Sequence, residues 1–210
     1  MNYPKFLPWI FLIAAYLIGS IPNGLIVSKL LHRKDIRKEG SGNIGATNAL
    51  RAFGTVTGLF VLLLDVAKGY FPTLLAMSIL GKDNSFVSII ALFVILGHMF
   101  PVYLKFKGGK GVATAAGVFL AIAPISLSMA ILVFLIVVVL FHYVSLASIC
   151  AAMAFHTHSL AILLKAEKAD YATLLLISVA VLLIVVKHKS NLERLINGSE
   201  SKLKFTKKGN

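Results

Sequence analysis

A turn made of glycine, lysine and phenylalanine has the composition of an anion-binding loop. Residues Lys105 to Gly111 read K-F-K-G-G-K-G and lie between two apolar stretches. Glycine lets successive backbone N–H groups converge on one point, and neighbouring lysines add positive charge beside them. We therefore expect Lys110, together with Gly108, Gly109 and Gly111, to bind a phosphate group.

Two other interpretations of this turn are weaker. It is not a Walker A loop, because Gly111 follows Lys110 where that motif has serine or threonine. A topology signal would explain the lysines, since basic loops stay on the cytoplasmic side of a membrane. It would give no reason for three glycines, so phosphate binding is preferred.

A second glycine-rich loop, G-S-G-N-I-G-A-T-N-A-L-R, runs from Gly40 to Arg51. Its glycines fit the spacing of a dinucleotide-binding fingerprint, but that fingerprint follows a strand, and the residues before this loop are I-R-K-E. A polar loop that caps the next helix is the alternative. Hydroxyl and amide groups can bind phosphate oxygens or substrate hydroxyls, and arginine binds oxyanions through two N–H groups. The candidate ligands are Ser41, Asn43, Thr47, Asn48 and Arg51.

Polar residues also occur at the ends of two later apolar segments. His188 and Asn191 follow the last segment with helical spacing, and Ser145 and Ser148 begin another in Y-V-S-L-A-S. Headgroup anchoring could explain any one of these clusters but not their occurrence on one membrane face. We predict that they join the two glycine loops in a single site.

Asp65 and Lys68 lie three residues apart inside an apolar segment, where either charge alone would be costly. They form a structural pair, or Lys68 reaches a bound phosphate, and the sequence leaves both possibilities open. His156 and His158 are two residues apart with no carboxylate beside them, so we predict no metal site.

The composition is that of an integral membrane protein. Hydrophobic residues make up 58% of the 210 positions, and only 14% are charged. The net charge of +13 suits anionic lipid or an anionic substrate. Nucleic acid is excluded as a partner because the basic residues form no continuous stripe.

The basic stretches predict the topology. Residues 29–51, 105–110 and 187–210 are rich in lysine and arginine, which places all three in the cytoplasm. At about 20 residues per crossing, the apolar segments between them predict an all-α protein with seven transmembrane helices. The N-terminus is then outside and the C-terminus cytoplasmic, and five crossings is the alternative. We expect helix breaks at Gly81–Ser85, Pro124, His142–Ser145 and Lys165–Asp170.

The first apolar run resembles a signal peptide but continues through Gly19–Gly24 to Leu31 without a convincing cleavage site, so we interpret it as a retained span. No repeat or composition shift marks a second domain. We expect residues 1–190 to form one helical catalytic domain. Residues 191–210 are expected to be a basic cytoplasmic tail, either mobile or lying on the membrane surface.

Taken together, the motifs resemble the bacterial acyl-phosphate:glycerol-3-phosphate acyltransferases of the PlsY type. The resemblance covers nearly the whole chain and is carried by G-S-I-P, the two glycine loops, D-V-x-K-G-Y-x-P, G-H-M-F-P-V, Y-V-S-L-A-S and H-x-S-N-x-x-R-L-x-x-G-x-E. It implies an enzyme of the bacterial cytoplasmic (inner) membrane with its active site facing the cytoplasm. The substrates would be acyl phosphate and glycerol 3-phosphate, and the products lysophosphatidic acid and phosphate. It implies no metal and no cofactor.

The resemblance also implies roles for individual residues. Ser41, Arg51, Lys110 and His188 correspond to catalytic positions, and Thr47, Asn191 and either Ser145 or Ser148 to substrate contacts. His142 departs from the family, where arginine is expected. Acyl phosphate is already activated, so we expect its own phosphate to act as the base, with His188 as a hydrogen-bonding positioner. The rival function is a membrane carrier for an organic phosphate, which should expose polar residues to both sides.

Overall fold

The computed structural model describes residues 3–82, 85–166 and 170–203, and within these ranges the chain is helical with no strand. The all-α prediction is therefore confirmed. In order, the elements are α1 (Leu7–Gly19), α2 (Asn23–His32), η1 (Ile36–Lys38), α3 (Ala46–Phe53), α4 (Thr55–Leu80), α5 (Ser85–Met99), η2 (Val102–Leu104), α6 (Val112–Ile122), α7 (Pro124–Phe141), α8 (Val144–Lys165), α9 (Tyr171–Lys187) and α10 (Lys189–Ile196).

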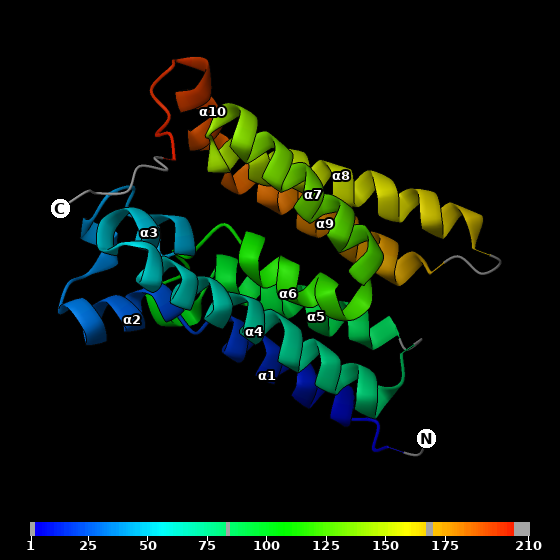
Figure 1. Cartoon of the computed structure of the whole chain (residues 1–210). Helices are drawn as coiled ribbons and strands as arrows, with labels where there is room; N and C mark the ends of the chain where they lie inside the picture. The colour runs from blue at the N-terminus through cyan, green and yellow to red at the C-terminus, as the bar shows by residue number, and fades with distance from the viewer. Residues whose placement is uncertain (1–2, 83–84, 167–169, 204–210) are drawn as a thin grey trace.

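The long helices form two groups that lie against each other. In Figure 1, α1, α4, α5 and α6 form one group and α7, α8 and α9 the other, while the short helices α2, α3 and α10 gather at one end. Helix α5 packs on α9, and α6 packs on α7, so these pairs join the two groups. Their shared core is aliphatic, with Ile95 from α5 and Ile177 from α9 almost fully buried.

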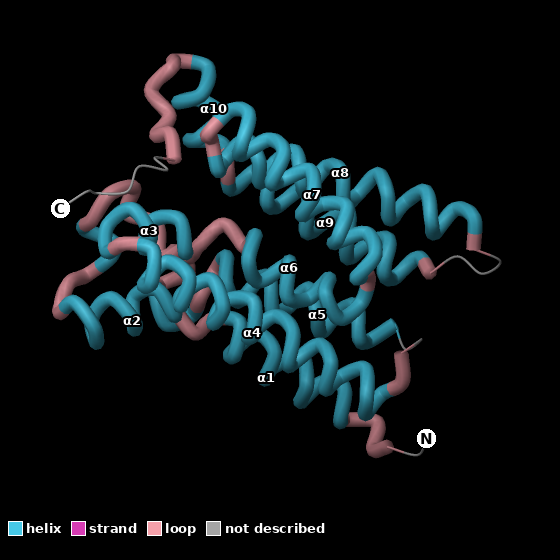
Figure 2. The backbone as a smooth tube through the Cα atoms, viewed as in Figure 1, coloured by secondary structure: helices cyan, strands magenta, loops and turns pink. Residues whose placement is uncertain are grey.

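Local sequence explains where the helices end. Pro124 occupies the first turn of α7, where its missing N–H costs nothing. Gly81 and His142 adopt positive φ values at the ends of α4 and α7. Asp170 caps α9 by accepting a hydrogen bond from the Thr173 N–H at 3.0 Å. Figure 2 shows the loops at these breaks, which fall within the four predicted regions, although residues 83–84 and 167–169 lie outside the described part.

The first apolar run is interrupted. Helix α1 ends at Gly19, and α2 begins at Asn23 after Pro22, a residue that cannot donate a backbone hydrogen bond. The prediction of a segment that continues to Leu31 holds for its apolar character, since Leu7–His32 has the length and hydropathy of a span. The prediction did not include the break between α1 and α2. This break turns α2 toward the end of the molecule that carries the glycine loops (Figure 1).

Five helical segments of the described chain are long and apolar enough to cross a membrane, or six if α9 and α10, bent by 50°, count as one. Helix α6 has 11 residues and is shorter than a bilayer requires, as predicted for the stretch before Pro124. Helix α7 leaves much of its apolar surface exposed, including Ile125, Val139 and Leu140. Such a surface is suited to lipid.

Helices α4 and α6 cross at small residues. A Cβ atom on Gly69 would lie 2.1 Å from the Thr114 carbonyl oxygen, and one on Gly117 would lie 2.0 Å from the Val66 carbonyl oxygen. Only glycine permits this approach, a common device in membrane helix packing. The crossing holds α6, and the lysine–glycine turn before it, against α4.

The segment after residue 190 is packed against the helices. Asn191 and Glu200 are buried, and the Leu203 N–H donates to the His142 carbonyl at 2.7 Å. Residues 191–203 therefore belong to the folded body, in contrast to the predicted appendage, because their polar groups have partners there. Residues 204–210 lie outside the described part.

Candidate active site

A cavity of about 450 Å³ lies between the two helix groups and has one polar end. The polar side chains come from both glycine loops, from α4 and α5, from the start of α8 and from the last segment of the chain. The remaining wall is apolar and is formed by α4, α6, α7, α8 and α9. The polar lining residues are Ser41, Asn43, Thr47, Asn48, Arg51, Asp65, His98, Lys110, Ser145, Ser148, His188, Asn191 and Glu200.

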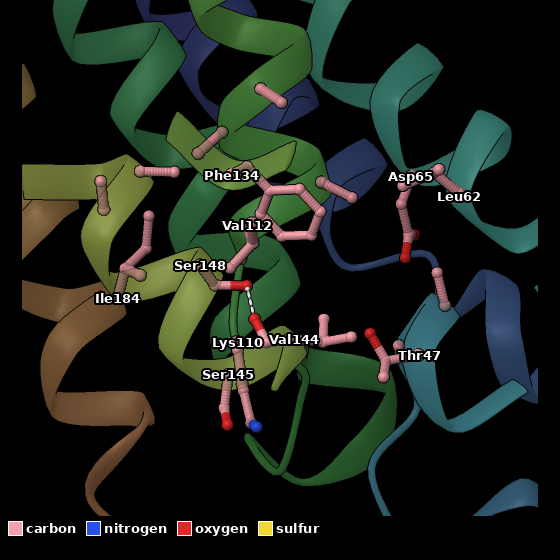
Figure 3. Close-up of a pocket in the computed structure, with 18 of the residues that line it drawn as sticks. Thr47, Leu62, Asp65, Lys110, Val112, Phe134, Val144, Ser145, Ser148 and Ile184 are labelled. Atoms are coloured by element: carbon pink, nitrogen blue, oxygen red, sulfur yellow. Dashed lines mark hydrogen bonds between the residues drawn. The ribbon is translucent and has the colours of Figure 1, made fainter. Parts of the chain in front are cut away.

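Figure 3 shows how these side chains face one another. Lys110, Ser145 and Ser148 lie on one side of the cavity, and Thr47 and Asp65 lie across from them. The Phe134 ring borders the apolar part above the serines. Residues far apart in the sequence thus meet in one site.

Asn48 organises the first glycine loop. Its amide nitrogen lies 2.8 Å from the Asn43 carbonyl and 3.0 Å from the Glu39 carbonyl, and its amide oxygen accepts from the Ser41 N–H at 2.9 Å. The Asn43 side chain accepts from the Gly45 N–H at 2.9 Å. Both side chains were predicted as substrate ligands; their contacts fix the loop that carries Ser41.

Helix α3 presents two candidate ligands on one face. Thr47 and Arg51 are four residues apart and both line the cavity. The Arg51 Nη2 donates to the Ser201 carbonyl at 2.8 Å, while its buried Nε has no hydrogen-bond partner among the described residues. The guanidinium of Arg51 carries a positive charge at the cavity wall, which favours an anionic ligand there.

The glycines of the second turn are explained by packing. A Cβ on Gly109 would lie 2.1 Å from His98 Nε2, and one on Gly111 would lie 2.3 Å from the Met99 side chain. The Gly109 N–H already donates to the His98 carbonyl at 3.1 Å, so it does not point to a ligand, contrary to the expected anion nest. Gly111 lines the cavity and Gly108 and Gly109 do not, which leaves the phosphate roles of those two glycines as predictions.

The packing of this turn brings Lys110 to the polar end. Its ammonium donates to the Asn191 side-chain oxygen. Burial lowers the pKa of Lys110 to about 8, against the opposing effect of Glu200. The lysine is therefore a cation whose charge is poorly solvated, which favours an anionic ligand beside it.

The junction between α9 and α10 carries the predicted His188 and Asn191. His188 is buried, and its Nδ1 lies 2.8 Å from the Ile184 carbonyl, which accepts only. Nδ1 therefore carries the proton in the neutral ring, and Nε2 is left as an acceptor. No carboxylate bonds to the ring in the described chain.

Glu200 is the member of the site that sequence reasoning missed. Its carboxylate accepts from Ser145 Oγ at 2.8 Å, from Asn191 Nδ2 at 2.8 Å and from Arg194 Nε at 2.7 Å. Burial raises the pKa of Glu200, but these three hydrogen bonds outweigh that effect and lower it. The only signal in the sequence was its place at the end of the last motif, where no chemistry had been assigned to it.

Both candidate serines line the cavity. Ser145 Oγ donates to the Glu200 carboxylate, and Ser148 Oγ donates to the Val144 carbonyl at 2.8 Å (Figure 3). Each hydroxyl also retains acceptor capacity toward a ligand. The structure therefore leaves either serine able to contact substrate.

Asp65 and Lys68 form the buried pair that the sequence suggested. The Lys68 ammonium lies 2.9 Å from Asp65 Oδ1 and 2.8 Å from the Ile21 carbonyl, and Asn23 Nδ2 donates to Asp65 Oδ1 at 3.0 Å. Lys68 is not part of the cavity wall, whereas Asp65 is. The geometry favours the structural alternative for Lys68, which ties α4 to the break after α1.

The chain is similar to known proteins over most of its length. Residues 9–198 match the family model for glycerol-3-phosphate acyltransferase. A glycerol-3-phosphate acyltransferase of Syntrophotalea carbinolica is 44% identical over 196 residues, which cover 93% of this chain and 97% of the relative. One from Staphylococcus aureus strain JH9 is 43% identical over 203 residues, covering 93% and 98%.

Two solved structures have the same fold. The crystal structure of PlsY, an integral membrane glycerol 3-phosphate acyltransferase, in its glycerol 3-phosphate form superimposes with a TM-score of 0.88 at 38% identity, covering 94% of this chain and 96% of that chain. The lysophosphatidic acid form gives a TM-score of 0.85 at 37% identity over the same shares. The chain therefore belongs to the glycerol-3-phosphate acyltransferase family.

Proposed function

We propose that this protein transfers a fatty acyl group from acyl phosphate to the 1-hydroxyl of glycerol 3-phosphate, giving lysophosphatidic acid and phosphate for phospholipid synthesis. The observation that carries the proposal is that one cavity joins a cationic, hydrogen-bonding end to an apolar wall. A phosphate compound and an acyl chain can bind there side by side. The family relationship supports the same reaction.

The two phosphate groups need positive charge between them. Arg51 approaches the cavity from α3 and Lys110 from the turn before α6. Arg51 contributes its guanidinium charge, and Lys110 a partly desolvated ammonium. We infer that these cations offset the repulsion between the substrates and stabilise the negative charge that develops on the carbonyl oxygen. Since they supply the charge, the proposal needs no metal ion.

His188 fits the role of a positioner. Its Nε2 accepts a hydrogen bond from the 2-hydroxyl of glycerol 3-phosphate and so directs the neighbouring 1-hydroxyl oxygen at the acyl carbonyl. The 1-hydroxyl oxygen forms the new ester bond as the bond between the carbonyl carbon and the phosphate oxygen breaks. The hydroxyl proton passes to the departing phosphate, which acts as the base.

The loop organisation supports the remaining contacts. Ser41, Asn43 and Asn48 lie in or hold the first loop, and Thr47 lies on its exit helix. We assign Ser41 and Thr47 to the glycerol phosphate because their hydroxyls line the same end as Arg51. Asn191 and one of the two serines complete the polar wall opposite.

The membrane arrangement is also part of the proposal. The polar end of the cavity is on the side of the basic loops, so by the positive-inside rule it faces the cytoplasm of a bacterial cell, at its inner membrane. Seven crossings result if Leu7–His32, the short α6 and the bent α9–α10 pair each count as one. The N-terminus is then outside and the C-terminus inside.

Reconstitution tests this function. Purified protein in lipid should release phosphate and form lysophosphatidate when given palmitoyl phosphate and glycerol 3-phosphate. Thioesters of coenzyme A and of acyl carrier protein serve as competing donors, and their exclusive use would refute the acyl phosphate assignment. Uptake of glycerol 3-phosphate into proteoliposomes without any lipid product would identify the carrier instead.

A further inference from the structure

Along α6 and α8, the lining residues furthest from the polar end are two aromatic residues. Phe119 on α6 and Phe155 on α8 both line the cavity, and each is only 3% exposed. Their ring centroids are 4.2 Å apart with an interplanar angle of 30°. Because the rings are in van der Waals contact, they close the space between α6 and α8 at this depth.

Beyond these rings lies a second cavity of about 400 Å³. Its wall begins one helical turn further along the same helices, at Ile122 on α6 and Ser159 on α8. Phe119 and Phe155 line only the first cavity, and Ile122 and Ser159 only the second. The aromatic pair therefore stands between the two.

The second cavity has a different chemical character. Ser88 and Thr173 share a hydrogen bond of 2.9 Å, Ser126 Oγ lies 3.0 Å from His158 Nδ1, and three of these side chains, Ser88, Ser126 and Thr173, line the space. The end of a hydrocarbon chain that passed the rings would desolvate these polar groups. That penalty adds to the steric barrier of the rings.

The depth of the first cavity suits a membrane fatty acid. On α8, Ser145 at the polar end and Phe155 are separated by about 15 Å along the helix axis at 1.5 Å per residue. That length is about half of a bilayer hydrocarbon core of ~30 Å, the thickness filled by the acyl chains of one leaflet.

We propose that the Phe119–Phe155 pair sets the length of the acyl chain that the enzyme transfers efficiently. The inference rests on the proposed function and goes beyond it, because it names the residues that select the donor. A chain that ends before the rings lies along the apolar wall over its whole length. Each further methylene finds no apolar space. It therefore does not bring the roughly fourfold gain in kcat/KM that burial of one methylene would give.

The test measures kcat/KM for saturated acyl phosphates of 12, 16 and 20 carbons in lipid-reconstituted protein. Phe119→Ala and Phe155→Ala should raise the ratio of the 20-carbon to the 16-carbon value about tenfold. Ala152→Phe fills the same wall one turn nearer the polar end and should raise the ratio of the 12-carbon to the 16-carbon value. Phe93→Ala removes a ring that packs on Tyr16 and lines neither cavity, so its ratios should equal those of wild type.

The outcomes separate this inference from the proposed function. If the alanine variants do not fold, the same ratios of kcat/KM are measured with Phe119→Leu, Phe155→Leu and Ala152→Phe. Unchanged ratios in all of these variants, with activity retained, would overturn the inference and leave the acyl transfer intact. Absence of lysophosphatidate from wild type with every acyl phosphate would refute the function itself.

Discussion

The side-chain oxygen of Asn191 accepts a hydrogen bond from the ammonium of Lys110, a residue 81 positions earlier in the chain. This contact joins the lysine–glycine turn to the junction that carries His188. Asn191 in turn donates to Glu200, which holds the last described segment over the cavity. Lys110, Asn191, Glu200, Ser145 and Arg194 thus form one connected hydrogen-bond network, and such networks respond as a unit when one member is removed.

The titration of Lys110 predicts an alkaline limit to activity. Its pKa of about 8 means that it is charged below that pH and neutral above it. We expect kcat/KM for glycerol 3-phosphate to fall as the pH rises through about 8, because a neutral amine does not attract phosphate. The arginine of Lys110→Arg stays charged, so this variant, if active, should lose the alkaline limb. A limb that persists in Lys110→Arg would assign it to another group.

Replacement of Arg51 should impair substrate binding and catalysis together. Arg51→Ala removes the guanidinium charge from the cavity wall, and we expect kcat/KM to fall about 10²–10³-fold, as for other groups that stabilise developing charge. Arg51→Lys should recover little, since lysine lacks the planar fork. The matched control is Arg37→Ala, whose exposed guanidinium pairs with Asp35 away from the cavity and whose loss should leave the rate unchanged.

His188 and the donor phosphate can be distinguished as bases. If His188 only positions the hydroxyl, His188→Asn should lower kcat about tenfold while the shape of the pH–rate profile stays the same. A general base would contribute 10²–10⁴-fold, and its loss would remove an acidic limb. Measurement of kcat from below pH 4 to pH 9 in both proteins decides between them, and disappearance of that limb would refute the positioning role.

Loss of the Glu200 carboxylate should destabilise the fold. Glu200→Ala leaves the Ser145, Asn191 and Arg194 donors without their acceptor, and unpaired buried donors cost about 1–3 kcal/mol each when water cannot reach them. We expect a clear drop in the thermal midpoint in detergent and a lower kcat/KM. Glu193→Ala, one turn into α10 with an exposed side chain, is the control and should melt with wild type. Equal midpoints for both variants would contradict the network.

The sequence alone established the class of the protein and most of its helix boundaries. Long apolar runs must become helices in a bilayer because no water satisfies their backbone groups, and proline, glycine and aspartate marked where they stop. The short helix before Pro124 was expected because this proline ends the segment early. The motifs also identified residues that the structure brings to one cavity, including Ser41, Arg51, Lys110 and His188.

What the tertiary structure decided was which groups are free and which are already engaged. Spacing cannot show that the Gly109 N–H is bonded to His98, that Asn48 is bound to its own loop, or that Lys68 pairs with Asp65 beside the Ile21 carbonyl. The contacts of Glu200 and of Phe119 with Phe155 likewise depend on residues distant in sequence. Hydrogen bonding and van der Waals contact act over a few ångströms, so only the packed chain determines which polar groups and which apolar walls a substrate meets.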